Sequence, residues 1–271
     1  MLWKPSNLKD TAAKGVKKLL VPFALYSLAG QVVKTVCLLT EGVTDLKPYL
    51  YSPLRSLVLG GTLSGNPPLW FIPSMFVVQC TAAWLTNKRS IPWLWAFVSV
   101  SLGYLLFLLD PEFVPTYIES AFGGLFFFFM GNWLKEWQYK KWVTVVCLIC
   151  TIAVLAFGLN GLIVRTNNVE DDCYFVGVLA SLVGCVAING LFRWLQPYLK
   201  LRVLQYVGRN AMTIYVTHWI VLSLSVGLLG YDLLHVSDSV RLLLIGGISY
   251  LVVIPIYIQI LKHFKSRKGF V

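Results

Sequence analysis

The chain alternates between long apolar stretches and short polar segments from residue 19 to residue 261. An α-helix needs about 20 residues to cross about 30 Å of hydrocarbon, and the apolar stretches are close to that length. Because backbone polar groups in lipid must be paired within their own segment, we expect helices. The pattern predicts eight transmembrane helices, at 19–40, 68–86, 91–109, 117–134, 142–163, 174–192, 211–230 and 242–261.

The charged residues alternate between the two sides of these predicted helices. The segments before the first helix and after the second, fourth, sixth and eighth hold 18 of the 23 Lys and Arg residues. The other four connections, with their flanking turns, hold 10 of the 12 acids. Since cationic loops stay in the cytoplasm, the sequence predicts an all-α polytopic membrane helix bundle with both termini cytoplasmic.

Composition narrows the class of protein further. With 57% hydrophobic and 13% charged residues, the chain is too apolar for an ordinary soluble domain. The net charge of +11 lies in the predicted cytoplasmic loops, so we expect the lipid bilayer, and no nucleic acid, as its partner. Cys147 and Cys150 form a CxxC inside an apolar helix with no histidine nearby, and no metal site is expected.

One membrane domain, 13–261, is predicted between basic cytoplasmic tails at 1–12 and 262–271. Its longest outer connection, 41–67, has leucine and valine at helical spacing, which indicates an interfacial helix. A glycine-rich stretch, 60–68, then turns the chain into the second membrane helix. Such a loop is a common place for an acceptor site, although a plain surface connector explains it equally well.

The seventh predicted helix carries a histidine, His218, in apolar surroundings. Gly208, Arg209 and Asn210 break the chain and cap this helix, and His218 follows nine residues after Arg209. At about 1.5 Å per residue, His218 lies roughly 13 Å deep, where an ionisable side chain usually faces a cavity or a polar partner. Tyr215 and Ser225 share its face. A histidine that only packs, hydrogen-bonded between helices, remains the alternative.

Two further features carry candidate chemistry. Two prolines flank Leu-Trp-Phe-Ile within 68–73, which should kink or delay the helix and place Trp70 at its outer mouth. Lys14, Lys17 and Lys18 precede the first membrane helix, where three cations can bind the phosphates of an anionic cofactor. These lysines are explained equally well as topology anchors.

Taken in order, three motifs resemble the integral-membrane acyltransferase 3 family, and especially its fucose O-acetylase-like sugar O-acetyltransferases. A basic segment leads into Leu-Leu-x-Pro-aromatic at 17–23, and a Leu-Trp-Phe-Leu-like element stands at 69–72. A Gly-x-Asn…Ile-Tyr…His element spans 208–218. The order and spacing agree over about residues 13–261.

The resemblance implies O-acetyl transfer at the bacterial inner (plasma) membrane. Acetyl-CoA would be the donor, bound as a substrate and not as a resident cofactor, and a hydroxyl of a cell-surface glycan or lipid-linked sugar the acceptor. His218 would have a supporting catalytic role. The residues implied for acyl-donor binding are Lys14, Lys17, Lys18 and Arg209, and those for the substrate pocket are Trp70, Asn210 and Tyr215.

The chain also departs from the family pattern. Family members resemble ten-helix proteins whose first helix carries a basic residue and an essential histidine, whereas this sequence opens where the third helix begins. No position here matches that histidine. The expectation is therefore that the chain alone has little activity unless a separate fragment supplies the first two helices.

Two alternatives of another class remain open at this point. The chain could be a transporter or flippase-like protein, or a non-catalytic membrane partner of glycan export. The predicted spans lack the carboxylates of proton-coupled carriers, and no inverted repeat is detectable.

The predicted topology is testable by cysteine labelling. Single cysteines introduced after Lys47, Glu112, Asp171 and Asp232 should react with a membrane-impermeant reagent from outside the cell, because these positions lie in the acid-rich connections. Labelling of two or more of them only from the cytoplasm would contradict the topology.

Overall fold

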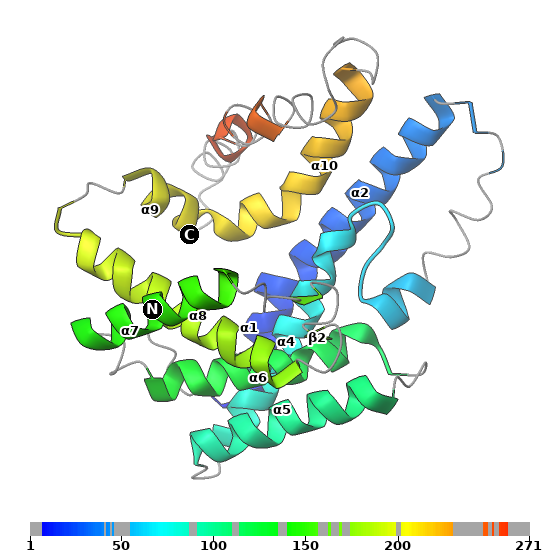
Figure 1. Cartoon of the computed structure of the whole chain (residues 1–271). Helices are drawn as coiled ribbons and strands as arrows, with labels where there is room; N and C mark the ends of the chain where they lie inside the picture. Colours follow the sequence, from blue (N-terminus) through cyan, green and yellow to red (C-terminus); the bar gives the residue numbers. More distant parts are fainter. Residues whose placement is uncertain are drawn as a thin grey trace. The chain divides into compact units, whose positions relative to one another are not determined.

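The computed structural model shows a predominantly helical protein (Figure 1). The residues that it describes are 7–40, 42, 43, 45, 55–86, 91–109, 114–134, 140–156, 162, 163, 168, 169, 174–198, 202–229, 246–248, 251 and 255–259.

The first half of the chain forms α1 (Leu8–Gly15), the π-helix η1 (Val16–Leu20), α2 (Val21–Thr40), the 3₁₀-helix η2 (Pro67–Trp70), α4 (Phe71–Thr86), α5 (Pro92–Leu109) and α6 (Thr116–Leu134). The second half forms α7 (Lys141–Ala156), β1 (Leu162–Ile163), β2 (Asn168–Val169), α8 (Tyr174–Leu195), α9 (Arg202–Arg209) and α10 (Ala211–Leu229).

Most predicted helices are confirmed as helices, with ends that differ by a few residues. This holds for 68–86, 91–109, 117–134, 174–192 and 211–230. As expected from its two prolines, the helix after residue 67 is delayed, because η2 precedes α4. The predicted helix 242–261 falls largely outside the described residues, although 246–248 and 255–259 are helical. Likewise, only 55–60 of the predicted interfacial helix is described, and it is helical.

The predicted helix 142–163 is wrong at its carboxyl end. The helix α7 ends at Ala156, and Leu162 pairs with Val169 in the antiparallel hairpin of β1 and β2. Gly158, Asn160 and Gly161 follow α7 in the sequence, and residues of these types disfavour helix.

The first predicted span, 19–40, is helical throughout, and its helix also extends beyond it toward the amino end. Asn7 caps α1, with its side chain accepting a hydrogen bond from the Lys9 amide at 3.4 Å. The helix then runs without a break from Leu8 to Thr40. Pro22 lacks the N–H that would bond the carbonyl four residues earlier, and the wider turn of η1 immediately precedes it.

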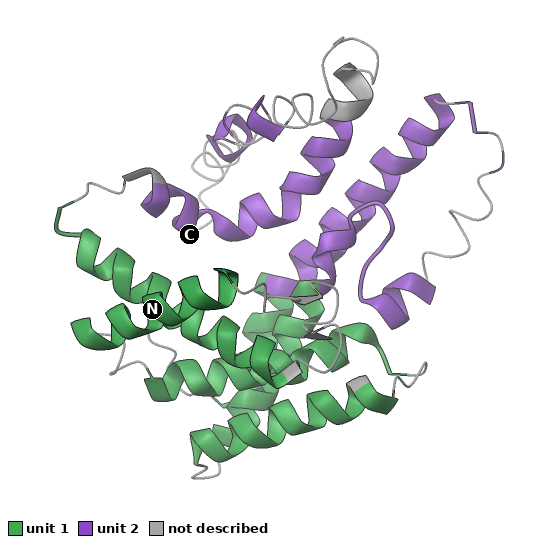
Figure 2. Ribbon diagram, viewed as in Figure 1, with its two compact units in different colours: residues 1–18, 71–201 green, residues 19–70, 202–271 purple. Residues whose placement is uncertain are grey.

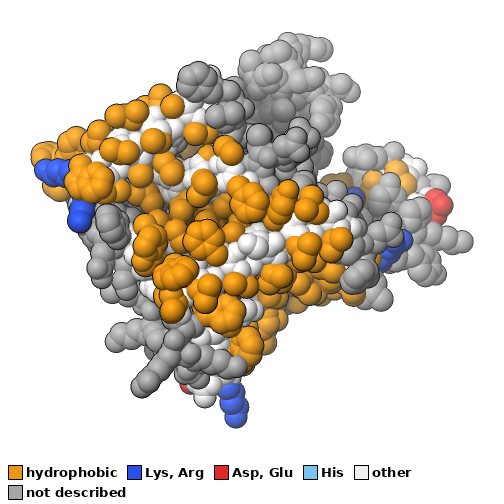
Figure 3. All heavy atoms as spheres, turned by 60° about the horizontal axis from the view of Figure 1, so that its bottom comes forward, with side chains coloured by type: hydrophobic (Ala, Val, Ile, Leu, Met, Phe, Trp, Pro, Cys, Tyr) orange, Lys and Arg blue, Asp and Glu red, His pale blue; other side chains and the backbone are white. Residues whose placement is uncertain are grey.

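Among the described helices, three are long and apolar enough to cross a membrane: Leu8–Thr40, Pro67–Thr86 and Phe175–Leu195. Shorter apolar helices lie at Pro92–Leu106, Lys141–Ala156 and Ala211–Leu224. Large apolar side chains are exposed along them, and hydrophobic side chains cover much of the face in Figure 3. Such a surface suits lipid. The count of eight spans and their orientation stay predictions.

The chain divides into two compact units (Figure 2). Unit 1 comprises 1–18 and 71–201, and its core joins α4, α5, α6 and α8 around Phe129, which is fully buried. Ala82, Ala96 and Ala121 are almost completely buried in this core, and small residues let membrane helices approach closely. Unit 2 comprises 19–70 and 202–271, in which α10 packs on α2 and η2.

Candidate active site

A polar stripe follows one face of α2 in unit 2. It consists of Ser27, Gly30, Gln31 and Lys34, at positions i, i+3, i+4 and i+7. Side chains at these spacings lie on the same side of a helix. Within a helix whose other residues are mostly apolar, such a stripe marks the face turned toward protein and not toward lipid.

The connection before η2 docks on this stripe through contact between two glycines. A Cβ added to Gly30 would lie 2.8 Å from the Gly65 carbonyl oxygen, and a Cβ added to Gly65 would collide with the Gly30 backbone. The side-chain oxygen Oε1 of Gln31 accepts hydrogen bonds from the Gly65 amide and the Ser64 hydroxyl, each at 3.3 Å. Lys34 donates to the Ser64 carbonyl at 3.4 Å.

The docked connection takes its shape from a helix-ending turn. Gly61 has a φ of +64° and donates to the Leu57 carbonyl at 3.1 Å, while Thr62 donates to Ser56 at 3.4 Å. The bond from the Gly61 amide to the Leu57 carbonyl, with Gly61 in the left-handed region, is the αL motif that ends helices, and glycine is favoured there because it has no Cβ. The turn brings 62–66 back against α2.

Asn66 links this connection to α10. Its side chain is fully buried, and its amide nitrogen donates to the Val216 carbonyl at 3.1 Å. The side-chain oxygen Oδ1 of Asn66, like the hydroxyl of buried Ser27, has no hydrogen-bond partner within the described residues. Because an unsatisfied buried polar atom costs about 1–3 kcal/mol, each of these two atoms would be stabilised by a further hydrogen bond.

The histidine of α10 lies on the same helix face as Tyr215, as the sequence predicts. The two rings are 5.7 Å apart, and both side chains are half-buried. The Tyr215 hydroxyl donates to the Pro68 carbonyl in η2. Tyr215 therefore fixes this part of α10 against the residues that precede Trp70.

The main-chain carbonyl of Tyr215 sets the tautomer of His218. It lies 2.6 Å from Nδ1 of the histidine. Since a carbonyl oxygen only accepts, Nδ1 must carry the hydrogen. In the neutral ring Nε2 then has the lone pair, which is the arrangement that a general base requires.

The remaining predicted pocket residues are less directly connected to His218. Trp70 is half-buried at the end of η2. The Asn210 carbonyl accepts the first hydrogen bond of α10, from Ile214 at 3.0 Å, but its side chain donates back to Tyr206 in α9 at 2.7 Å. Asn210 therefore starts α10 through its main chain, and its side chain turns toward α9. The Ser225 side chain falls outside the described part of the chain.

The predicted donor-binding cations lie on exposed helix surfaces. Lys14 is in the last turn of α1, and Lys17 and Lys18 are in η1. Arg209 belongs to unit 2, at the end of α9. All four side chains are exposed, as binding of a soluble anion requires.

Comparison with known proteins identifies the family. The model of the acyltransferase 3 family, described as an acyltransferase domain, matches residues 1–258. The chain therefore belongs to this family and is a membrane acyltransferase, which confirms the family that its motifs indicated. The sugar O-acetyltransferase subtype and the absence of the first two helices stay predictions. No curated protein and no solved structure matched the chain.

Ser27, Gly30, Gln31, Lys34 and Asn66 are site residues that the sequence reasoning missed. The stripe on α2 was detectable, because four non-apolar residues recur at helical spacing within an apolar helix and one of them is a lysine. Asn66 gives no such signal, since its partner Val216 is 150 residues away.

Gly65 offers a direct test of the docked connection. Gly65→Ala should push 62–66 off α2 and destabilise the protein by about 1–3 kcal/mol or more, because the new Cβ meets backbone that cannot move aside. The matched control is Gly60→Ala, since a Cβ there meets nothing within 4 Å. Thermal unfolding in detergent measures both, and equal stability of the two variants would contradict the contact.

Proposed function

We propose that this acyltransferase transfers an acetyl group from acetyl-CoA to a hydroxyl of a cell-surface glycan or its lipid-linked precursor at the inner membrane. In that reaction the acceptor oxygen forms an ester bond with the acetyl carbon, and the bond from this carbon to the CoA sulfur breaks. The acceptor proton passes to a base, and CoA leaves as the thiol. The observation that carries the proposal is the bond that holds Nδ1 of His218 on the Tyr215 carbonyl.

The residues around His218 support a polar acceptor. A sugar offers several hydroxyls, which proteins recognise by hydrogen bonds. In unit 2, Asn66 and Ser27 each have a buried oxygen with bonding capacity left within the described residues, and Gln31 and Lys34 add further polar groups on the stripe of α2. We propose that Trp70, Asn210 and Tyr215 complete the wall of this acceptor pocket.

The exposed cations support an anionic donor. The phosphates of acetyl-CoA would bind the exposed lysines of unit 1, Lys14, Lys17 and Lys18, by charge-assisted hydrogen bonds. The π-helix that carries two of these lysines is a rare element, and such turns occur frequently at functional sites.

Replacement of His218 tests the proposed chemistry. His218→Ala should lower the rate of acetylation by roughly 100-fold or more if the imidazole moves the proton. Acetyl transfer from labelled acetyl-CoA to membrane glycan measures the rate, with the chain expressed alone and together with a fragment that carries the family's first-helix histidine. Leu224→Ala is the control, since this exposed residue lies on the same helix.

His218→Gln distinguishes the two roles of the histidine. Glutamine hydrogen-bonds but does not titrate, so near-normal activity would indicate an orienting role, and a loss like that of His218→Ala would implicate proton transfer or a geometry that glutamine cannot copy. Unchanged activity of His218→Ala, with folded protein at normal levels, would exclude both.

The donor site is testable separately. Lys14→Ala, Lys17→Ala and Lys18→Ala combined should raise KM for acetyl-CoA roughly tenfold, with a smaller effect on kcat, because each ion pair of an exposed lysine contributes about 0.2–1 kcal/mol. Lys9→Ala removes an exposed cation of α1 outside the proposed set and should leave KM unchanged. An unchanged KM in the triple variant would assign these lysines to topology alone.

A further inference from the structure

In unit 1, the amino end of α7 and the carboxyl end of α8 pack closely against each other. Gly190 makes this possible, since a Cβ at this position would collide with the buried side chain of Thr144. Two cavities open along this crossing, and each is lined by both helices.

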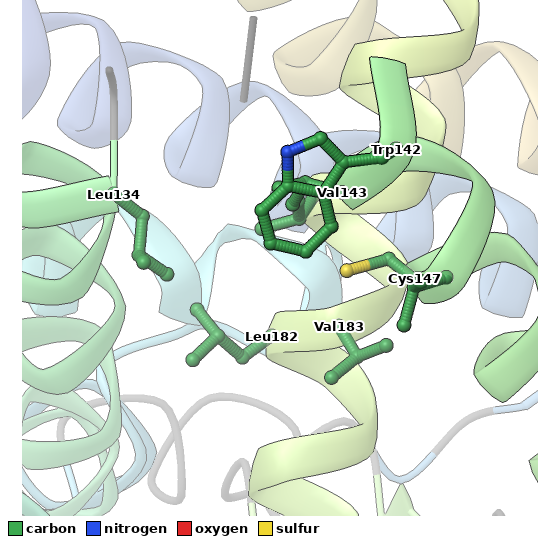
Figure 4. A pocket seen from close by; sticks show the side chains of 8 residues that line it. Leu134, Trp142, Val143, Cys147, Leu182 and Val183 are labelled. Carbon is green, nitrogen blue, oxygen red and sulfur yellow. The ribbon is translucent and has the colours of Figure 1, made fainter. Parts of the chain in front are cut away.

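The first cavity is an apolar groove of about 260 Å³. Figure 4 shows its lining side chains, among which Trp142 and Cys147 of α7 and Leu182 of α8 surround a common space. Leu134 and four valines complete it: Val143, Val146, Val183 and Val186. The groove therefore suits a hydrocarbon chain.

The second cavity is a cationic cleft of about 330 Å³. Lys141 and Arg193 supply positive charge, and both side chains are exposed. Trp194 and Tyr198 line the same cleft and are also exposed, as is typical of side chains at a membrane interface. The charge and the aromatic edges suit a phosphate-bearing head group.

One face of α8 joins the two cavities. Val183, Val186, Gly190 and Arg193 recur at three- and four-residue spacing, so they form a single stripe that passes from the groove into the cleft. A ligand that occupies both must combine a hydrocarbon chain with an anionic head.

We propose that the groove and the cleft together bind one anionic phospholipid. Its head-group phosphate lies between Lys141 and Arg193, and one acyl chain follows α8 past Gly190 into the apolar groove. A soluble phosphate compound would use the cleft but gain nothing from the groove. This site lies in unit 1 and does not depend on the proposed acetyl transfer.

The test uses the full chain purified in detergent and titrated with phosphatidylglycerol, with phosphatidylcholine of the same acyl chains as the neutral comparison. Native mass spectrometry counts the bound lipids. Lys141→Ala with Arg193→Ala should weaken phosphatidylglycerol binding roughly tenfold to thirtyfold, because each cation near an anionic lipid contributes about 1 kcal/mol. The matched control is Lys9→Ala with Lys140→Ala, which removes the same charge from exposed positions outside the cleft.

A second pair of variants tests the groove. Val146→Trp fills it and should weaken phosphatidylglycerol binding severalfold, whereas Val145→Trp adds the same bulk at an exposed neighbour outside the lining. Equal affinity for the two lipids, equal losses in the two charge variants, or no difference between the tryptophan variants would each overturn the proposal. Displacement of the lipid by millimolar inorganic phosphate would assign the cleft to a soluble anion instead.

Discussion

The candidate site depends on one contact, the approach of the Gly30 and Gly65 backbones. There non-helical chain lies directly against α2, close enough for the Gln31 side chain to reach the Gly65 amide at 3.3 Å. This contact places the Asn66 side chain where it donates to the Val216 carbonyl. It also places the Pro68 carbonyl, in η2, where it accepts from the Tyr215 hydroxyl. The orientation of Tyr215 and His218 is therefore set by residues that carry no chemistry themselves.

This contact also supplies hydrogen-bond partners to backbone that would otherwise be unpaired within an apolar helix bundle. Irregular backbone cannot face hydrocarbon, because its N–H and C=O groups would be unpaired. In 61–66 the missing partners are supplied by the main-chain hydrogen bonds that Gly61 and Thr62 donate, by the bond from the Thr62 hydroxyl to the main-chain carbonyl of Asn66, and by the side chains of α2. A polar stripe on one helix thus permits an open turn beside it.

The sequence predicted the helices well where a long apolar run determines them, as in α5 and α6. It failed where a local exception decides the outcome. Helix α7 ends at Ala156, before the hairpin of β1 and β2, although the predicted span continues to residue 163. Helix α1, capped by Asn7, also extends the first helix ahead of the predicted span, through a segment too polar to be recognised as part of it. Of the site, His218 and Tyr215 were predicted because both stand on one helix. Asn66 and Gly65 were not, because their partners are distant in sequence.

The carbonyl that orients His218 belongs to the main chain of the same helix, three residues earlier. Every residue has a main-chain carbonyl, so no side-chain substitution at position 215 removes this hydrogen-bond acceptor. The orientation of the ring at position 218 therefore depends on the helical backbone of α10 and not on a second side chain, and a variant of Tyr215 alters the packing of α10 on η2 while the acceptor stays in place.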